Sequence, residues 1–273
     1  MRRLINQHPG RGERFALGVL PFVALLGAYV LASQWRLAAN PDDKLLPSLA
    51  QIGTTLHAYA FEEDARSGHV LLWTDTFASL LRIGAALGIS ALLGLGVALT
   101  VGAVPRARAV LMPLVGAVSM IPPLAILPIL FIVLGLEETA KITLIVIGIT
   151  PVIARDLAQR VAELPSEQLV KAQTLGASTW QLLLRVVLPQ TLPRLLDALR
   201  LGMGAAWLFL IAAEAIASES GLGYRIFLVR RYLAMDVILP YVAWITLLAF
   251  LMDRALLIAQ KRAFPWFAAA RAS

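Results

Sequence analysis

The chain has 273 residues, of which 59% are hydrophobic and 15% are charged, and its mean hydropathy is +0.77. Soluble globular domains are about 45–50% apolar and about 25% charged, so this composition excludes an ordinary soluble protein. The net charge is +7, but the basic residues are scattered, which fits the arginine excess of a membrane protein better than a nucleic-acid-binding surface. The chain has no cysteine, which excludes disulfide frameworks, cysteine-based zinc sites and thiol nucleophiles.

Apolar stretches along the chain predict six membrane-spanning helices, since crossing the hydrocarbon core takes about 20 mostly apolar residues. The last three stretches are uncharged but short, so each helix must extend past a polar residue to cross. The pattern therefore predicts an all-α integral membrane protein. The expected spans are 15–35, 83–105, 109–136, 142–154, 201–213 and 237–252.

The first span, 15–35, is followed by a polar stretch, 36–72. The apolar run of this span is longer than the roughly 7–15 residues of a signal-peptide core, so we expect a retained helix. The polar stretch is predicted to be a periplasmic loop, with an amphipathic helix near 69–81.

Basic residues gather on one side of the six-span arrangement. They precede the first span, follow the last, and fill the loops after the second and fourth spans. By the positive-inside rule this side is cytoplasmic, which makes 1–14 and 259–273 cytoplasmic tails. Three arginines after the fifth span depart from the rule, namely Arg225, Arg230 and Arg231.

Two features inside the predicted spans are unusual for a lipid-facing helix. Pro122 and Pro123 interrupt the third span, and the carbonyl groups that prolines leave unbonded need burial or a watery cavity. The two prolines predict a broken helix, which either lies beside a translocation path or is a kink that only aids helix packing. Glu214 lies in the fifth span, where a carboxylate must be paired or face water. It fits a pathway or gate residue, or a structural partner of Arg82 or Arg200.

The loop 160–193, after the fourth span, is too polar to cross the membrane but contains helix boundaries. Ser166 predicts the cap of a short helix with a glutamate in its first turn, and Gly176 suits the left-handed residue that ends such a helix. Ser178, with a glutamine three residues later, predicts a capping box and a second helix that runs to Pro189. The element is either an ordered docking surface or an ordinary helical hairpin.

Several segments resemble a known family. Gly176, then nine residues, then Val186 and shortly Leu188-Pro189 resemble the second half of the EAA loop of binding-protein-dependent ABC transporter permeases. The segments SMIPPLAILPILFIVLGLEETAKI, KAQTLGASTWQLLLRVVLPQTLP and AAEAIASESGLGYRIF are similar to the nitrate, taurine and aliphatic-sulfonate branch of that family. The resemblance extends over about 73–267.

The resemblance implies the MetI-like fold of type I importers, with a core over 73–258 and a cytoplasmic coupling helix between the fourth and fifth spans. That helix sits in a groove of an ATPase subunit. The Glu-Ala-Ala of the family falls on Val170, Lys171 and Ala172, so only the last alanine is kept, and Glu167 is the candidate to replace the glutamate. The implied coupling residues are Glu167, Val170, Lys171, Ala172, Gly176, Leu188 and Pro189.

The same resemblance implies a permease subunit of an ATP-driven importer in the bacterial plasma (inner) membrane. Its partners would be a second copy in a homodimer, two ATP-binding subunits, a periplasmic or lipoprotein solute-binding protein, and membrane lipid. The segment 221–232 would face outward near the gate, where the binding protein could dock. The implied path and gate residues are Pro122, Pro123, Glu214, Gly221 and Gly223.

A catalytic role for the chain itself is not expected. None of its four lysines follows a glycine, so the phosphate-binding motif GxxxxGK[ST] is missing and ATP hydrolysis is expected on a separate chain. The histidines are dispersed, and no nucleophile–base set or metal-ligand spacing is recognisable. We therefore expect no catalytic residue, no cofactor, no metal and no nucleic-acid partner.

Two other function classes stay open at this point. A secondary transporter or channel that works alone predicts a carboxylate network inside the spans and inverted repeats; the sequence shows one deep carboxylate and no convincing repeat. An integral-membrane enzyme is the other class. The solute is not determined by the sequence, because nitrate, taurine, another sulfonate and a small guanidine- or urea-like compound all fit the branch.

Overall fold

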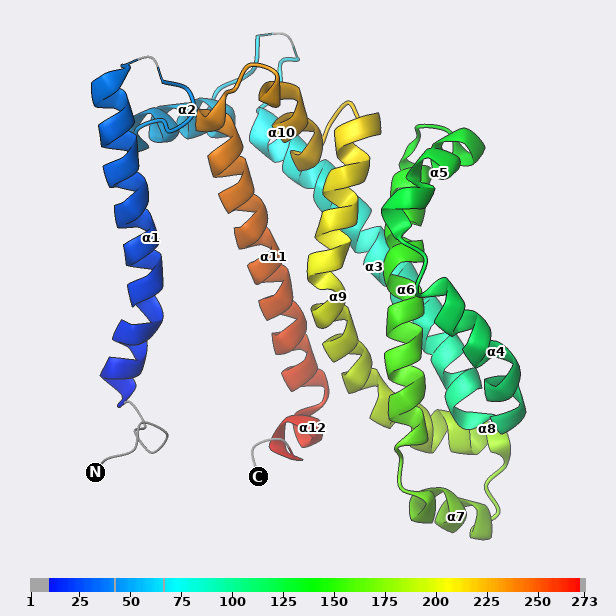
Figure 1. Cartoon of the computed structure of the whole chain (residues 1–273). Helices are drawn as coiled ribbons and strands as arrows, with labels where there is room; N and C mark the ends of the chain where they lie inside the picture. The colour runs from blue at the N-terminus through cyan, green and yellow to red at the C-terminus, as the bar shows by residue number, and fades with distance from the viewer. Residues whose placement is uncertain (1–9, 42, 66, 271–273) are drawn as a thin grey trace.

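The computed structural model describes residues 10–41, 43–65 and 67–270, which form helices joined by short loops (Figure 1). The outer parts of the two predicted tails, 1–9 and 271–273, lie outside the described residues. The long helices are α1 (Arg11–Ala39), α3 (Leu71–Ala103), α6 (Glu138–Ala162), α9 (Leu188–Ala217) and α11 (Met235–Ala263). The shorter ones are α2 (Leu49–Phe61), α4 (Pro105–Val118), α5 (Leu127–Leu134), α7 (Ser166–Thr174), α8 (Thr179–Leu182), α10 (Leu222–Arg230) and α12 (Pro265–Ala270).

The helices that can cross a membrane agree with the prediction. Five are long and apolar enough to cross alone. The segments Pro105–Val118 and Pro123–Leu134 pass the same test only together, and they are bent by 78° where they meet. Counted as one broken span, they bring the number in the described residues to six, which confirms the predicted all-α fold. The helix break predicted from Pro122 and Pro123 lies at this bend.

The helices are longer than the uncharged stretches that predicted them. α3 begins at Leu71 rather than at residue 83, and α6 covers Glu138–Ala162 rather than 142–154. Charged side chains near these helix ends lie against other helices and pair there, so they do not end the helix. An apolar run marks only the part of a helix that needs no polar partner, which is why the predicted ends were wrong.

The helix predicted near 69–81 is present, but its assignment to the loop is wrong. From Leu71 onward this segment is the first part of α3, and the helix in the loop before it is α2. Ser48 caps α2 in a capping box with Gln51: the Gln51 N–H donates to the Ser48 hydroxyl over 3.2 Å and the Ser48 N–H donates to the Gln51 side chain over 2.8 Å. This local signal for a helix start was present in the sequence.

Glycines allow α3, α6 and α9 to pack closely. A Cβ atom on Gly102 of α3 would lie 2.5 Å from Val161 on α6, and one on Gly148 of α6 would lie 2.3 Å from Phe209 on α9. Small residues at such contacts let the backbones of membrane helices approach each other. The three helices therefore form one close-packed unit, which positions the polar side chains described below.

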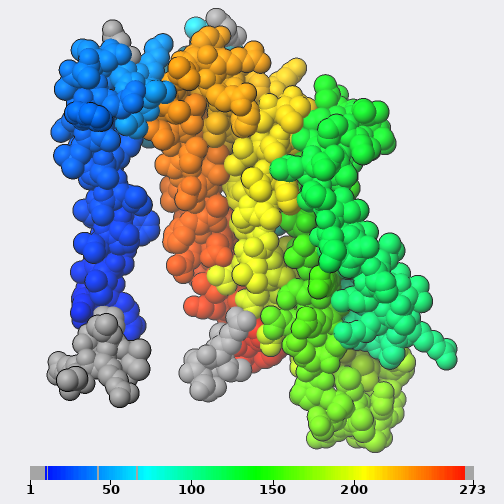
Figure 2. All heavy atoms as spheres, viewed as in Figure 1, coloured from blue at the N-terminus to red at the C-terminus, as the bar shows by residue number. Residues whose placement is uncertain are grey.

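α1 stands apart from the other helices along most of its length (Figures 1 and 2). None of the apolar window that qualifies it as a span is buried. It is attached near its C-terminal end, where Tyr29 and Ser33 donate hydrogen bonds to the carbonyl of Pro47 over 2.6 and 3.2 Å. Arg36 donates a hydrogen bond to Asp43 in the same region and lowers the pKa of that carboxyl. The apolar length of α1 is thus free to contact lipid or another chain.

Replacing Gly102 with leucine should destabilise the close-packed unit, because the new side chain overlaps Val161 and the backbone of α6. We expect the free energy of unfolding to fall by about 1–3 kcal/mol, the usual effect of overpacking. Thermal unfolding in detergent micelles measures this. Gly88→Leu on the same helix is the control, since a Cβ there meets nothing within 4 Å; equal melting temperatures for the two variants would contradict the packing argument.

Candidate functional site

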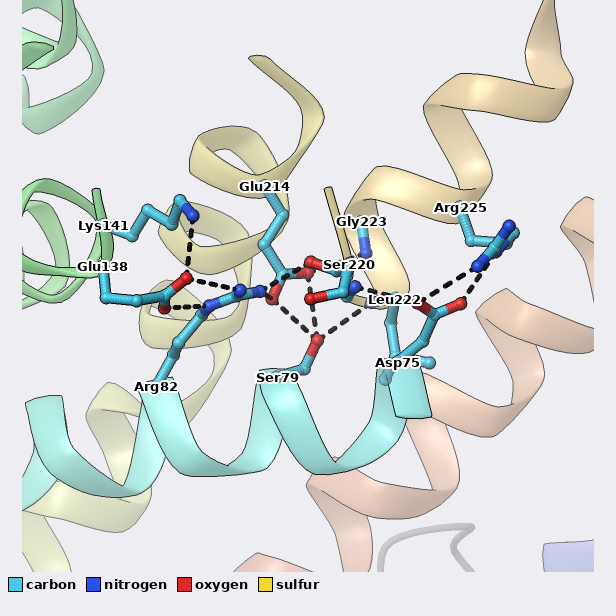
Figure 3. Close-up of polar contacts among 11 residues, drawn as sticks. Asp75, Ser79, Arg82, Glu138, Lys141, Glu214, Ser220, Leu222, Gly223 and Arg225 are labelled. Carbon is cyan, nitrogen blue, oxygen red and sulfur yellow. Dashed lines mark hydrogen bonds and ion pairs between the residues drawn. The ribbon is translucent and has the colours of Figure 1, made fainter. Parts of the chain in front are cut away.

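Three polar side chains lie along one face of α3, near the end of the bundle that carries α10 (Figure 3). Asp75, Ser79 and Arg82 follow the spacing i, i+4, i+7, which places them on one side of a helix. Their exposed fractions are 0%, 0% and 5%. Polar groups buried this deeply need hydrogen-bond partners, and charged ones need opposite charges.

The Arg82 guanidinium joins four parts of the chain. It donates two hydrogen bonds to Glu138 at the start of α6, over 2.5 and 2.7 Å. It also donates to Glu214 on α9 over 2.8 Å and to the carbonyl of Ser220 over 2.7 Å. Lys141 adds a further hydrogen bond to Glu138, over 3.0 Å. One side chain on α3 thus holds α6, α9 and the turn that follows α9.

The turn between α9 and α10 is bound to the network through its backbone. Gly221 has φ of +126°, and a Cβ atom there would lie 2.5 Å from the Glu214 carboxyl group, so only glycine fits. Three backbone N–H groups of this turn donate hydrogen bonds to buried side chains of the network. Successive N–H groups donate from Gly221 to Asp75 (2.9 Å), from Leu222 to Ser79 (2.9 Å) and from Gly223 to Glu214 (2.8 Å).

A second ion pair completes the network on α10. Arg225 donates to Asp75 over 2.8 Å, and the Tyr241 hydroxyl of α11 donates to the same carboxylate over 3.2 Å. The charges of the network balance, with three acidic and three basic side chains. They are Asp75, Glu138 and Glu214, against Arg82, Lys141 and Arg225. A balanced cluster leaves no surplus charge to attract a charged solute.

Of the two partners considered for Glu214, the structure shows Arg82. Glu214 is completely buried and also accepts hydrogen bonds from the Ser79 hydroxyl over 2.8 and 3.0 Å. Arg200 instead donates to Asp253 on α11, over 2.8 and 3.2 Å. The structural partnership of Glu214 is therefore established, whereas its part in a gate stays a prediction.

A second group of predicted residues lies at the opposite end of the bundle, on α7 and the residues around it (Figure 1). α7 ends before Gly176, whose φ is +79°, as predicted. The cap of α7 is Pro165, with Ser166 as the first helical residue, so the predicted serine cap is wrong. Proline is favoured near a helix start because it has no N–H to leave unbonded. The Ser178 capping box is confirmed, with the Gln181 N–H donating to the serine hydroxyl over 3.3 Å.

The helix that begins after Ser178 does not end at Pro189. α8 continues through a π-helical turn, Leu183–Val187, directly into α9, and Pro189 lies in the first turn of α9. The proline is tolerated because the change of hydrogen-bond pattern at the π turn starts a new helical segment there. The side chain of Gln190 donates to Gln168 on α7 over 3.0 Å. α7 is thus tied to the start of α9.

The surface of α7 and α8 is mostly polar, but it also carries exposed apolar side chains. Leu169 and Ala172 of α7 pack against a small separate core. Val170 of α7, Leu175 directly after α7 and Trp180 of α8 are 55%, 80% and 67% exposed. Apolar groups clustered on an otherwise polar surface mark interaction sites. The sequence pattern did not single out Leu175 or Trp180, although both lie inside the loop it did single out.

Comparison with known proteins adds to this geometry. Residues 90–265 match the family described as binding-protein-dependent transport system inner membrane component. The taurine transport system permease protein TauC of Escherichia coli (strain K12) is 40% identical over 195 residues, which are 71% of this chain and 71% of that protein. The chain belongs to this permease family.

Other relatives agree with this membership. The bicarbonate transport system permease protein CmpB of Synechococcus elongatus is 30% identical over 243 residues, 86% of each chain. The MetNI methionine ABC transporter, solved in an inward-facing conformation, is similar to this permease with a TM-score of 0.56 over 67% of this chain and 93% of that one. At 20% identity this likeness shows the fold alone. It confirms the expected MetI-like fold, and the family confirms a multi-pass permease subunit of an ABC transporter.

The residues implied by the resemblance lie in three places in the permease. The predicted gate residues Glu214, Gly221 and Gly223 come together in the buried network, while Pro122 and Pro123 lie at the bend between α4 and α5. The predicted coupling residues lie at the other end, on α7 and the start of α9. They are Glu167, Val170, Lys171, Ala172, Gly176, Leu188 and Pro189.

The network also contains residues that the sequence pattern did not single out as functional. Asp75, Ser79 and Glu138 are examples, and they lie outside every uncharged stretch. The i, i+4, i+7 spacing of Asp75, Ser79 and Arg82 was a usable signal, because such a polar row at the start of an apolar helix predicts a shared partner. That partner could not be found from spacing, since Glu214 lies 132 residues from Arg82.

Replacing Arg82 with alanine should strongly destabilise the permease, because it leaves the fully buried Glu214 carboxylate without its ion pair. Breaking one side of a buried pair costs about 3–5 kcal/mol. Thermal unfolding in detergent micelles is the measurement. Arg254→Ala is the control, since that exposed arginine stacks on Phe250 at the surface and its loss should cost less than about 1 kcal/mol. A melting temperature for Arg82→Ala equal to that of the control would contradict the role given to the network.

Proposed function

We propose that this chain is the transmembrane permease subunit of an ATP-driven, binding-protein-dependent importer of a small polar solute, with both termini in the cytoplasm. The observation that carries the proposal is the apolar surface of Val170, Leu175 and Trp180, exposed on the element where the family resemblance expects an ATPase to dock. The solute is a sulfonate such as taurine, nitrate, or a related small nitrogenous compound. The relatives named for taurine and bicarbonate transport support a small solute that carries an oxyanion.

The ATPase-docking surface is defined by α7, α8 and the turn between them. Hot spots of protein interfaces are enriched in tryptophan, so the exposed Trp180 is the candidate anchor of this surface, together with the exposed Leu175. Glu167 is exposed in the first turn of α7 and is available to replace the glutamate that the family has at Val170. Two ATP-binding subunits, one on each copy of the permease, would supply the hydrolysis.

Coupling follows from the path of α9 through the molecule. Its start is tied to α7 by the hydrogen bond from Gln190 to Gln168, and its far end carries Glu214 in the buried network. A helix of 30 residues is about 45 Å long. When ATP closes the ATPase pair, a push on α7 is carried by this rod to the turn at Gly221, which changes the permease from inward-facing to outward-facing.

The partners on the other faces are inferred from exposed surface. The apolar length of α1 and the exposed Leu201, Leu208 and Ile216 of α9 are available to lipid and to a second copy of the permease. At the end carrying α10, Arg230 and Arg231 are exposed beside Tyr232 and Leu233, which are 70% and 53% exposed. Leu233 has a left-handed backbone with φ of 55°, a conformation that non-glycine residues avoid and that concentrates at functional segments. We assign this basic and aromatic patch to the solute-binding protein.

Replacing Gly176 with valine should uncouple ATP hydrolysis from uptake. Valine resists the left-handed backbone at φ +79°, so the turn must change and displace the docking surface. We expect uptake of labelled taurine or another sulfonate by proteoliposomes holding the whole transporter to fall at least about tenfold, a loss of about 1.4 kcal/mol in coupling.

Gly68→Val is the matched control, because Gly68 has φ of +66° and open surroundings but lies in the loop before α3. The backbone strain is similar in both variants, whereas only Gly176 adjoins the docking surface. Normal uptake by Gly176→Val, with normal insertion into the membrane, would overturn the coupling assignment.

Replacing Trp180 with alanine should weaken binding of the ATPase subunit. The loss of an exposed aromatic anchor typically costs 2 kcal/mol or more, which is about a 30-fold rise in Kd. The Kd is measured between the ATPase subunit and the permease in lipid nanodiscs. Trp35→Ala is the control, because Trp35 is 79% exposed but lies near the C-terminal end of α1, and that end of α1 lies far from α7 and α8 (Figure 1). The same Kd for both variants would show that the ATPase binds elsewhere.

A further inference from the structure

Arg194 in the first turns of α9 lies between two hollows near α7. The larger hollow, about 400 Å³, is bounded by the start of α7, the start of α9 and the C-terminal helix α12. The smaller hollow, about 280 Å³, lies between α6, α9 and α11. Arg194 and Arg160 line both hollows, so these two residues form the wall between them.

The larger hollow has more positive than negative side chains, whereas the smaller one is balanced, because Asp156, Asp197 and Asp253 line it together with Arg160, Arg194 and Arg200. The Arg194 guanidinium lies 5.1 Å above the ring centre of Phe267 on α12, and among the described residues no carboxylate is within salt-bridge distance of it. Arg160 has Asp156 and Glu163 at 3.6 and 3.9 Å, both longer than a good hydrogen bond. Two guanidinium groups therefore face the larger hollow against the single carboxylate of Glu163.

The rest of the larger hollow is amphipathic. Gln168, Gln190 and Thr191 contribute amide and hydroxyl groups, while Leu164, Pro165, Trp266 and Phe267 contribute apolar walls. Trp266 is half exposed and Phe267 is buried. Tryptophan is enriched at the headgroup level of membranes, and arginine is the residue best suited to bidentate binding of a phosphate. A volume of about 400 Å³ lies in the range of small-molecule sites.

The level of the hollow relative to the membrane follows from α11 and α12. α11 is a span whose last turn carries Lys261 and Arg262, and α12 begins two residues after it ends. In the orientation of the proposed function, on which this inference rests, that is the headgroup level of the cytoplasmic leaflet. Basic pockets at this level bind anionic lipid headgroups.

We propose that the hollow between α7, α9 and α12 binds the headgroup of an anionic phospholipid, with its phosphate held between Arg160 and Arg194. The site adjoins the coupling element directly, because Gln168 of α7 and Gln190 of α9 share a hydrogen bond in its wall. A bound lipid steadies the start of α7, so the lipid composition of the membrane regulates how firmly the docking surface is held.

The test counts lipids on the full-length permease alone, by native mass spectrometry after titration with phosphatidylglycerol or phosphatidylcholine. We expect one phosphatidylglycerol per chain to bind in preference to phosphatidylcholine. Arg194→Gln should weaken this binding about fivefold, the factor for one arginine near an anionic surface, and Arg194→Lys should retain most of it. Arg254→Gln is the matched control, since Arg254 stacks on Phe250 in the same way but lines neither hollow, and it should bind phosphatidylglycerol as the wild type does.

Three results would overturn the proposal. One is equal phosphatidylglycerol binding by the wild type and by Arg194→Gln when both variants melt at the same temperature. Another is equal competition by soluble glycerol 3-phosphate, which would identify a free phosphate ester as the ligand. The third is displacement of the lipid by the ATPase subunit, which would make the hollow a protein contact. The measurement uses neither ATPase activity nor uptake, so its failure is distinguishable from a failure of the proposed function.

Discussion

The cost of burying charge within a membrane protein is the constraint on which this structure depends. Arg82 and Glu214 are almost completely removed from solvent, and each is tolerated only because the other is there. Their partners come from α3, α6, α9 and the turn before α10, so satisfying the charges requires all these elements in one arrangement. The same pairing requires a glycine at position 221, because a side chain there would displace the Glu214 carboxylate.

The close packing of α3, α6 and α9 joins the two ends of the permease through one continuous set of helix contacts. At Gly102 and Gly148 these helices pack so closely that there is no room for a side chain. α9 is one continuous helix from the region of α7 to the buried network. The ends differ in chemistry. The network is closed and neutral, which suits a rigid support, whereas the surface around Trp180 is open and apolar, which suits a partner.

Most of the fold was predictable because it depends on local signals. Apolar runs located the six spans, the prolines at 122 and 123 located the bend, and the capping box at Ser178 located a helix start. Pairing was not predictable in this way, since Arg82 meets partners 56 and 132 residues away. For the same reason the predicted spans stop at Arg82 and Lys141, although both residues lie within helices, α3 and α6. The helix end predicted at Pro189 is wrong because a π turn precedes this proline, so the helix continues although Pro189 has no N–H to donate.

The most direct test of the account follows the end of the permease that carries α10 while ATP acts at the other. A spin label at the exposed Glu219, one on each copy, reports the distance between the two turns by double electron–electron resonance. If α9 couples the two ends, a non-hydrolysable ATP analogue shifts this distance distribution when the ATPase subunits are present, and leaves it unchanged in the permease alone. An unchanged distribution in the complete transporter, with the ATPase subunits shown to have closed, would contradict coupling through α9.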